Sequence, residues 1–151
     1  MKTSNQEFNS ETSYEIIDIA SFDGYSFKGK LTTPKGENIS KLVIYVNGSG
    51  ANTYDNKRSG FNYFDLFAHE FSNRGVAFFS YNTRGCQIGD KPPIYTDINY
   101  DEYQTYLPLN SVEDICYMIR TIKENDRLKD CKVYLLGWSE GTVIAPLVAE
   151  K

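Results

Sequence analysis

The sequence lacks several features that would assign it to a particular class of protein. It has one histidine and three cysteines in 151 residues, and no apolar run approaches the length of a membrane span. The cysteines are odd in number and show no C-x-x-C or other metal-ligand spacing: Cys86, Cys116 and Cys131. We therefore expect neither a disulfide framework nor a metal site, and reduced thiols in a cytoplasm fit this pattern best.

An excess of positive charge is also absent. Sixteen Lys and Arg residues stand against twenty Asp and Glu residues, which gives a formal net charge of -4. Nucleic acids and anionic membranes attract basic surfaces, so we expect neither as a partner. Residues 1 to 8 contain no apolar stretch of the signal-peptide kind, which predicts an unprocessed cytoplasmic protein.

The composition that remains is that of one globular domain. Hydrophobic residues make up 40% of the chain and charged residues 24%, enough for a single core. Residues 1 to 13 are polar and without period, and are predicted to form a flexible arm before a domain at 14 to 151. The runs 14–20 and 25–32 flank an Asp-Gly turn, which predicts an antiparallel hairpin with one solvated face.

The middle of the chain alternates strand and helix patterns. Continuous apolar runs at 42–46 and 76–81 are typical of strands covered on both faces, and a helical pattern at about 61–74 separates them. A helix opened by Ser111 as a capping-box variant then leads to a third such strand at 132–136. Strands joined by helices predict an α/β fold with parallel pairing.

Between Cys86 and Asn110 no periodicity is evident, so a long irregular loop is predicted. Loops of this length are uncommon in compact domains and often carry function. The loop is rich in tyrosines, which would either form an aromatic wall for an apolar substrate or fix the loop to the surface: Tyr95, Tyr100, Tyr103 and Tyr106.

Near the end of the chain a strand pattern runs directly into Gly137-Trp138-Ser139-Glu140-Gly141, and an apolar helical pattern follows. A serine at the tip of such a sharp strand-to-helix turn has a strained backbone, and the residues two before and two after it come too close for a Cβ. Gly137 and Gly141 occupy those two positions. The spacing therefore predicts a nucleophile elbow with Ser139 at its tip.

Three segments follow the expected parallel strands in chain order: Asn47-Gly48-Ser49-Gly50, Tyr81-Asn82-Thr83-Arg84-Gly85 and the Gly137 to Gly141 turn. Together they resemble the motifs of the α/β-hydrolase superfamily, most closely its esterases and prolyl-oligopeptidase-like members. The resemblance covers residues 14 to 151. It implies a mostly parallel sheet with an N-terminal antiparallel hairpin, helices on both faces, and truncation after the nucleophile helix.

The same resemblance implies where the site lies and what it does. The strand ending at Val46 should neighbour the strand ending at Leu136, with the site at their shared carboxyl end. Ser139 corresponds to the nucleophile, and the backbone N–H groups of Glu140 and Ser49 correspond to the oxyanion hole. The implied activity is cleavage of small-molecule carboxylic esters through an acyl-enzyme, without a metal or a cofactor. The Glu140 carboxylate is expected only to interact with the helix dipole.

The chain departs from the family pattern in three respects. Asn47 stands where histidine is usual, and Asn82 where aspartate is usual. The acid and the base follow the serine in this family, and the ten residues after Gly141 contain no histidine. His69, far upstream, is expected to be a surface or half-buried helix residue. The triad is therefore incomplete, and the 151-residue chain alone is expected to be inactive.

Two other functions remain open. One is a non-catalytic binding protein that kept the scaffold without the acid and base, and the other is a serine peptidase of the prolyl-oligopeptidase type. Such peptidases commonly carry a separate gating domain, for which 151 residues leave no room. The strand 132–136 is apolar on both faces and is expected at the edge of the sheet, which predicts self-association of the chain.

Overall fold

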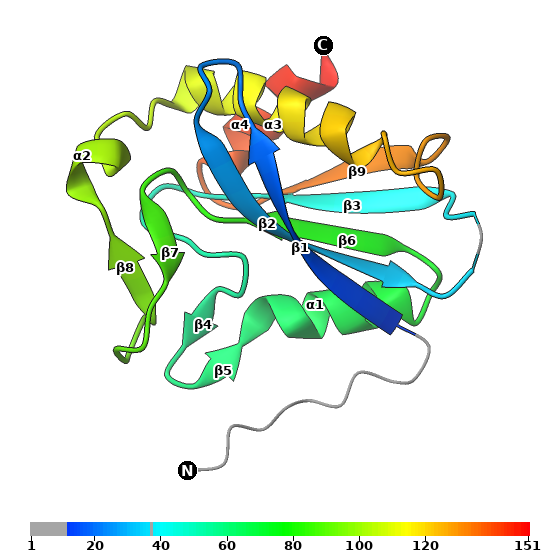
Figure 1. Ribbon diagram of the computed structural model, residues 1–151, viewed down its shortest axis with the longest axis horizontal. Helices are drawn as coiled ribbons and strands as arrows, with labels where there is room; N and C mark the ends of the chain where they lie inside the picture. The colour runs from blue at the N-terminus through cyan, green and yellow to red at the C-terminus, as the bar shows by residue number, and fades with distance from the viewer. Residues whose placement is uncertain (1–11, 37) are drawn as a thin grey trace.

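The computed structural model describes residues 12–36 and 38–151, so the arm predicted at 1 to 13 lies almost wholly outside the described residues. The described part forms a five-stranded sheet with helices on both faces (Figure 1). Its strand order is β1-β2-β6-β3-β9. These strands are β1 (Thr12–Ala20), β2 (Ser26–Pro34), β3 (Lys41–Val46), β6 (Ala77–Tyr81) and β9 (Lys132–Gly137).

Strand β3 lies between β6 and β9 and is parallel to both of them. Leu42 is paired with Ala77 of β6 on one side and with Val133 of β9 on the other. The hairpin β1-β2 joins this parallel group through antiparallel pairing of β2 with β6. The predicted neighbours are confirmed, because Val46 and Gly137 are paired at the carboxyl ends of β3 and β9. Within the described residues β9 pairs with β3 alone, so β9 is a sheet edge.

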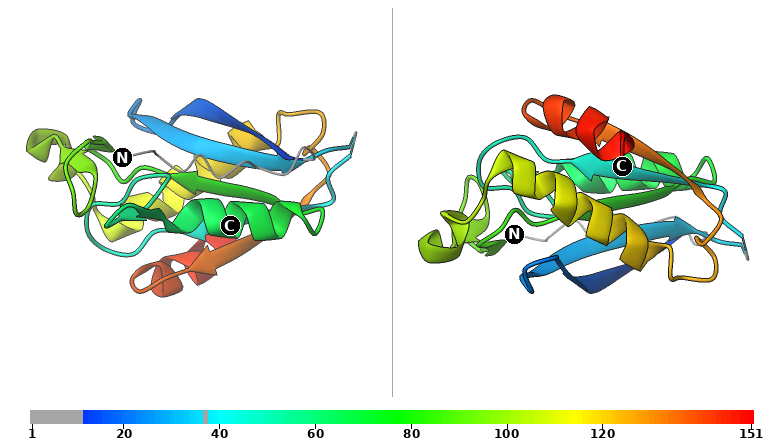
Figure 2. Two further views of the ribbon diagram at one scale, coloured as in Figure 1. Left: turned by 90° about the horizontal axis from the view of Figure 1, so that it is seen from below. Right: turned by 90° about the horizontal axis from the view of Figure 1, so that it is seen from above.

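Three helices cover the sheet. They are α1 (Tyr63–Ser72), α3 (Pro108–Ile122) and α4 (Gly141–Ala149). Helix α1 lies against one face, whereas α3 and α4 lie against the other (Figure 2). The crossover through α1 leads from β3 to β6, and the crossover through α3 returns past β3 to β9. Strand order therefore reverses at β3, and in open α/β sheets ligands bind at such a point.

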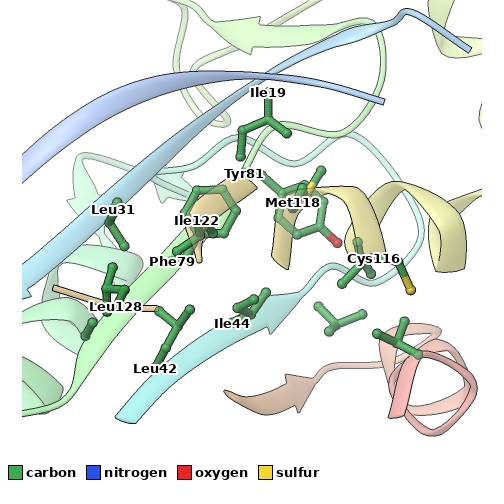
Figure 3. Close-up of a cluster of buried hydrophobic side chains, with 14 of the residues drawn as sticks. Ile19, Leu31, Leu42, Ile44, Phe79, Tyr81, Cys116, Met118, Ile122 and Leu128 are labelled. Carbon is green, nitrogen blue, oxygen red and sulfur yellow. The ribbon is translucent and has the colours of Figure 1, made fainter. Parts of the chain in front are cut away.

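A core fills the space between the sheet and α3 with α4 (Figure 3). Ile44 of β3 and Phe79 of β6 are fully buried there, and Met118 and Ile122 of α3 pack against this cluster. Burial of each such side chain contributes about 1.5 to 3 kcal/mol. A smaller cluster around Phe78 lies on the α1 side. No helix in the described part of the chain is long and apolar enough to cross a membrane.

The N-terminal hairpin is present, but its second strand does not have the solvated face that the alternating pattern predicted. From Gly29 onward every residue of β2 is buried, since β2 lies between β1 and β6. The cation on this strand, Lys30, is accommodated by two carboxylates. Its Nζ lies 2.7 Å from Asp65 and 3.2 Å from Asp55. The polar residue on which the alternation depended is therefore buried in an ion-pair cluster.

The segment predicted as an irregular loop contains secondary structure. Its ordered elements are β7 (Cys86–Ile88), β8 (Thr96–Ile98) and the single turn α2 (Tyr100–Tyr103). Helix α3 begins at Pro108, three residues before the predicted start, because proline is well suited to the first helical position. A further short hairpin, β4 (Lys57–Arg58) with β5 (Phe61–Asn62), precedes α1.

Candidate active site

The turn between β9 and α4 has the strained geometry that its two glycines predicted. Ser139 is exposed and has a φ of +53°, in the left-handed region that most residues avoid. A Cβ on Gly137 would lie 2.4 Å from the carbonyl oxygen of Gly141, and a Cβ on Gly141 would lie 2.2 Å from that of Val46. The crowding around both positions therefore requires glycine, and it brings the start of α4 against the end of β3.

The loop after β3 lies directly beside this turn. A Cβ on Gly48 would be 3.0 Å from the Cβ of Ser139 and 2.9 Å from the Trp138 carbonyl oxygen. The amide of Asn52 holds the loop in place, because its Nδ2 donates to the carbonyl oxygens of Gly48 (3.2 Å) and Gly50 (3.1 Å). Two loops that lie about 90 residues apart in the sequence thus meet at Ser139.

The two backbone amides that the sequence assigned to an oxyanion hole are not used elsewhere. In the described part of the chain, neither Ser49 N–H nor Glu140 N–H donates a hydrogen bond to a protein atom. The neighbouring amides of Gly141 and Thr142 do donate, to the carbonyl oxygens of Trp138 and Ser139. Ser49 and Glu140 therefore keep free donors, one on each of the loops that meet at Ser139.

The two asparagines that replace the usual family residues hold these loops to the sheet. The side chain of Asn47 donates to the Tyr81 carbonyl oxygen (3.0 Å), and its backbone N–H donates to the Tyr81 hydroxyl (3.3 Å). Asn82 accepts a bond from the Tyr54 N–H at 2.8 Å. Complete burial raises the pKa of the Tyr81 phenol, which therefore acts as a neutral partner for Asn47.

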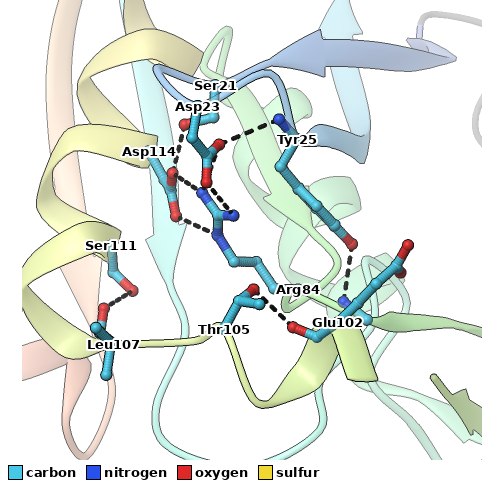
Figure 4. Close-up of polar contacts among 10 residues, drawn as sticks. Ser21, Asp23, Tyr25, Arg84, Glu102, Thr105, Leu107, Ser111 and Asp114 are labelled. Atoms are coloured by element: carbon cyan, nitrogen blue, oxygen red, sulfur yellow. Dashed lines mark hydrogen bonds and ion pairs between the residues drawn. The ribbon is translucent and has the colours of Figure 1, made fainter. Parts of the chain in front are cut away.

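Arg84, in the loop after β6, is the centre of a buried ionic network (Figure 4). Its Nη2 lies 2.7 Å and its Nε 3.1 Å from the carboxylate of Asp114, and its Nη1 lies 2.7 Å from that of Asp23. The guanidinium also lies over the ring of Tyr25, 4.8 Å from the ring centroid. The sequence presented Asp114 only as part of a helix start, whereas the structure places it as the buried counter-ion of Arg84.

The side chain of Glu140 has a partner that the sequence did not indicate. Its carboxylate accepts a hydrogen bond from the hydroxyl of Tyr106, which lies between α2 and α3. Burial and this bond to a negative group raise the pKa of the Tyr106 phenol. A neighbouring loop therefore holds the Glu140 carboxylate, in addition to the helix-dipole interaction that its position predicted.

A cleft of about 510 Å³ opens beside Ser139, on the α1 side of the sheet. Five of the eleven described residues that line it are aromatic, and none of them is a tyrosine of the segment 86–110. Of the two roles that the sequence left open for these tyrosines, the aromatic wall is therefore wrong for this cleft. The cleft is lined by Tyr45, Gly48, Ser49, Asn52, Asn56, Arg58, Tyr63, Phe64, Phe67, Trp138 and Ser139.

The single histidine of the chain lies away from the cleft. His69 is half-buried on α1, where its Nε2 is 2.9 Å from the Nδ2 of Asn73, and it does not line the cleft. Among residues 12–36 and 38–151 no group of three or more His, Cys, Asp or Glu side chains could hold a metal ion.

Comparison with known proteins agrees with this architecture, although no family model matches the chain. Esterase EstD of Thermotoga maritima is 26% identical over an aligned length of 149 residues, and the alignment covers 93% of this chain and 33% of EstD. The structure of the α/β-hydrolase GrgF from Penicillium is similar with a TM-score of 0.60 and 16% identity, over 91% of this chain and 41% of GrgF.

An esterase from Pyrobaculum calidifontis aligns with a TM-score of 0.58 and 17% identity, over 91% of this chain and 39% of that one. The chain thus spans about a third of the length of its curated relative and about two fifths of these structures. The chain has the α/β-hydrolase fold, as its three loop motifs predicted.

Proposed function

We propose that this chain carries the nucleophile and the oxyanion hole of a serine hydrolase that cleaves carboxylic esters. The observation that carries the proposal is the exposed Ser139 at φ +53°, with Gly48 packed against it and free amides at Ser49 and Glu140. The similarity to an esterase from Thermotoga maritima supports an ester as the substrate.

In the proposed reaction the Oγ of Ser139 attacks the ester carbonyl carbon while a base takes the hydroxyl proton. The carbonyl oxygen becomes negative, and the N–H groups of Ser49 and Glu140 stabilise it, each by about 3 kcal/mol. The C–O bond to the alcohol then breaks, the alcohol leaves with the proton from the base, and an acyl-enzyme remains. Water hydrolyses the acyl-enzyme by the reverse sequence of proton transfers.

Among the described residues, no histidine, aspartate or glutamate lines the cleft beside Ser139. The only histidine, His69, lies outside the cleft, and the carboxylate of Glu140 is hydrogen-bonded to Tyr106. We propose that the base and its acid come from residues outside the 151 described by this sequence. Without the base of such a triad, turnover falls about a millionfold. The 151-residue chain should accordingly show negligible turnover of p-nitrophenyl acetate and almost no fluorophosphonate labelling.

A longer product of the same gene that contains a downstream acid and histidine provides the test. It should react with a fluorophosphonate at Ser139, and Ser139→Ala should abolish the labelling. Unchanged labelling of the Ser139→Ala variant would refute the nucleophile assignment. Absence of labelling in a longer product that does contain both groups would favour the non-catalytic binding protein.

The oxyanion assignment is tested in the same longer product with a matched pair of variants at Ser49. Ser49→Ala keeps the backbone N–H and should retain turnover, whereas Ser49→Pro removes the N–H and should lower kcat about a hundredfold. Circular dichroism spectra of both variants report whether the fold is kept. Equal turnover of the two folded variants would show that the amide of Ser49 is not a donor to the transition state.

A further inference from the structure

The cleft beside Ser139 contains an unpaired cation. Arg58 is the only charged residue that lines the cleft within the described residues, and no acidic side chain joins it there. Its guanidinium makes no hydrogen bond or ion pair with the described part of the chain. Five other cations of the protein do have carboxylate partners: Lys28, Lys30, Arg74, Arg84 and Lys151.

The backbone of Arg58 is held in position at the cleft. Arg58 lies in β4 and is paired with Phe61 of β5, across a tight turn in which Ser59 and Gly60 have φ values of +47° and +86°. The N–H of Ser59 donates to the Pro93 carbonyl oxygen at 2.8 Å, which fixes the tip of the hairpin to a neighbouring loop. Helix α1 begins at the residue directly after this hairpin, so the backbone that carries the Arg58 side chain has a fixed position relative to the cleft.

The remainder of the cleft is suited to an apolar group. Phe64 and Phe67 of α1 pack against Tyr45 of β3, with ring centroids 4.4 and 6.3 Å from that of Tyr45. Trp138, which is 68% exposed, adds a further ring beside Ser139. Pockets that combine aromatic walls with a few polar groups bind small ligands by their apolar body and orient them by the polar contacts.

We propose that this cleft binds a substrate with an apolar body and a carboxylate, and that Arg58 recognises the carboxylate. The guanidinium presents a planar fork of donors that matches a carboxylate in bidentate geometry. The protein carries a net charge of -4, so an anion gains affinity at a local cation and not from the overall field. The inference rests on the proposed function, since it assigns an acid-bearing ester to the site of Ser139.

Binding to the 151-residue chain tests this assignment without any need for turnover. Trp138 is the only tryptophan of the chain and lines the cleft, so its fluorescence reports occupancy directly. The probes are 4-phenylbutyrate and the uncharged 4-phenylbutyramide, which differ only in the terminal group. The carboxylate should bind about ten- to a hundredfold more tightly than the amide, the range expected for a charged hydrogen bond.

Substitutions separate Arg58 from other sources of anion binding. Arg58→Ala should abolish the preference for the carboxylate and leave amide binding within about twofold, whereas Arg58→Lys should keep part of the preference. Arg74→Ala is the matched control, because it removes an exposed arginine that is paired with Glu70 and does not line the cleft. A carboxylate preference that persists in a folded Arg58→Ala chain would overturn the proposal, since the free amides near Ser139 would then be the anion site.

Failure of the inference and failure of the proposed function have different signatures. Ser139→Ala should keep the carboxylate preference, because the hydroxyl of Ser139 takes no part in recognition of the anion. Loss of the preference in Arg58→Ala supports the inference whatever the labelling of Ser139 shows. Equal binding of both probes to the wild-type chain refutes the inference and leaves the nucleophile assignment standing.

Discussion

Replacement of Arg84 by methionine should destabilise the protein by about 3 to 4 kcal/mol. Methionine keeps the apolar length of the side chain, so the loss reports the charge more than a cavity. The side chain of Asp114 is only 5% exposed, and without Arg84 it would keep the hydrogen bond from the hydroxyl of Ser21 but no cation. Loss of one partner from a buried ion pair costs about 3 to 5 kcal/mol. Asp23 is 40% exposed and can return to water, so it contributes at most about 1 kcal/mol.

Urea unfolding followed by circular dichroism at low micromolar concentration measures this effect. With an m-value of about 1.5 to 2 kcal/mol/M, the midpoint should fall by about 2 M. The double variant Arg84→Met with Asp114→Asn should recover about half of the loss, because it removes the uncompensated charge. A double variant no more stable than Arg84→Met, or a single variant within about 0.5 kcal/mol of the wild type, would refute the reasoning.

The same network predicts a dependence on pH. Hydrogen bonds from Arg84 hold the pKa of Asp23 below its ordinary value of 3.8. A lowered pKa in the folded state means that Asp23 contributes stability above about pH 4, and that this contribution is lost as the pH falls through the lowered value. The decrease in stability between about pH 4 and 2 should therefore be smaller in Arg84→Met than in the wild type. A decrease of equal size in both proteins would contradict the assignment.

Three further predictions concern the turn, the sheet edge and the thiols. Gly141→Ala should destabilise the protein by about 1 to 3 kcal/mol or more in urea unfolding, because the added Cβ would lie 2.2 Å from the Val46 carbonyl oxygen. Ser139→Ala, on the same turn, is the control and should leave the stability nearly unchanged. The chain should self-associate at tens of micromolar through the edge strand β9, and Leu136→Lys should reduce the self-association. Light scattering that shows a stable wild-type monomer at this concentration would count against the prediction. Burial raises the pKa of the Cys86 thiol to about 11, so about one Cys86 thiol in a thousand is ionised at pH 8. Cys116 and Cys131 are buried as well, so Ellman's reagent should react with the chain only after unfolding, and rapid reaction of the folded chain would contradict the burial of its thiols.

The arrangement of the main sheet could be predicted because each of its strands has a strong local signal. The continuous apolar runs of β3 and β6 identify strands covered on both faces, and the helical patterns that lead to β6 and β9 require parallel pairing. The apolar run of β9 does not mean the same, because Tyr134 and Leu136 are exposed on this edge strand. The hairpin β7-β8 could not be predicted, because strands of three residues are too short for a period of two to be recognised in the sequence. The true start of α3 did have a signal, since Pro108 is typical of a first helical position.

The local part of the candidate site was likewise visible in the sequence. The conformation of the Ser139 turn depends on glycines two residues away on either side, so a five-residue window contains the information. Contacts between distant segments could not be predicted in this way, because no short stretch of sequence contains both partners. The bond from Tyr106 to Glu140 and the ion pair of Arg84 with Asp114 join residues 34 and 30 positions apart, and only the packing of α3 against the sheet brings them together. Nothing in the sequence singles out Arg58, because a two-residue strand has no pattern of its own.

The position of β3 between β6 and β9, two strands that follow it in the chain, has a consequence for synthesis on the ribosome. Lys41 of β3 pairs with Lys132 of β9, about ninety residues later in the chain. At about 5 to 20 residues per second, one side of β3 stays without its partner strand for roughly 5 to 20 seconds after β3 has been made. The hairpin β1-β2 needs no such wait, because its strands are joined by a short turn. Chaperones that bind nascent apolar segments would therefore meet β3 before they meet its parallel partners β6 and β9.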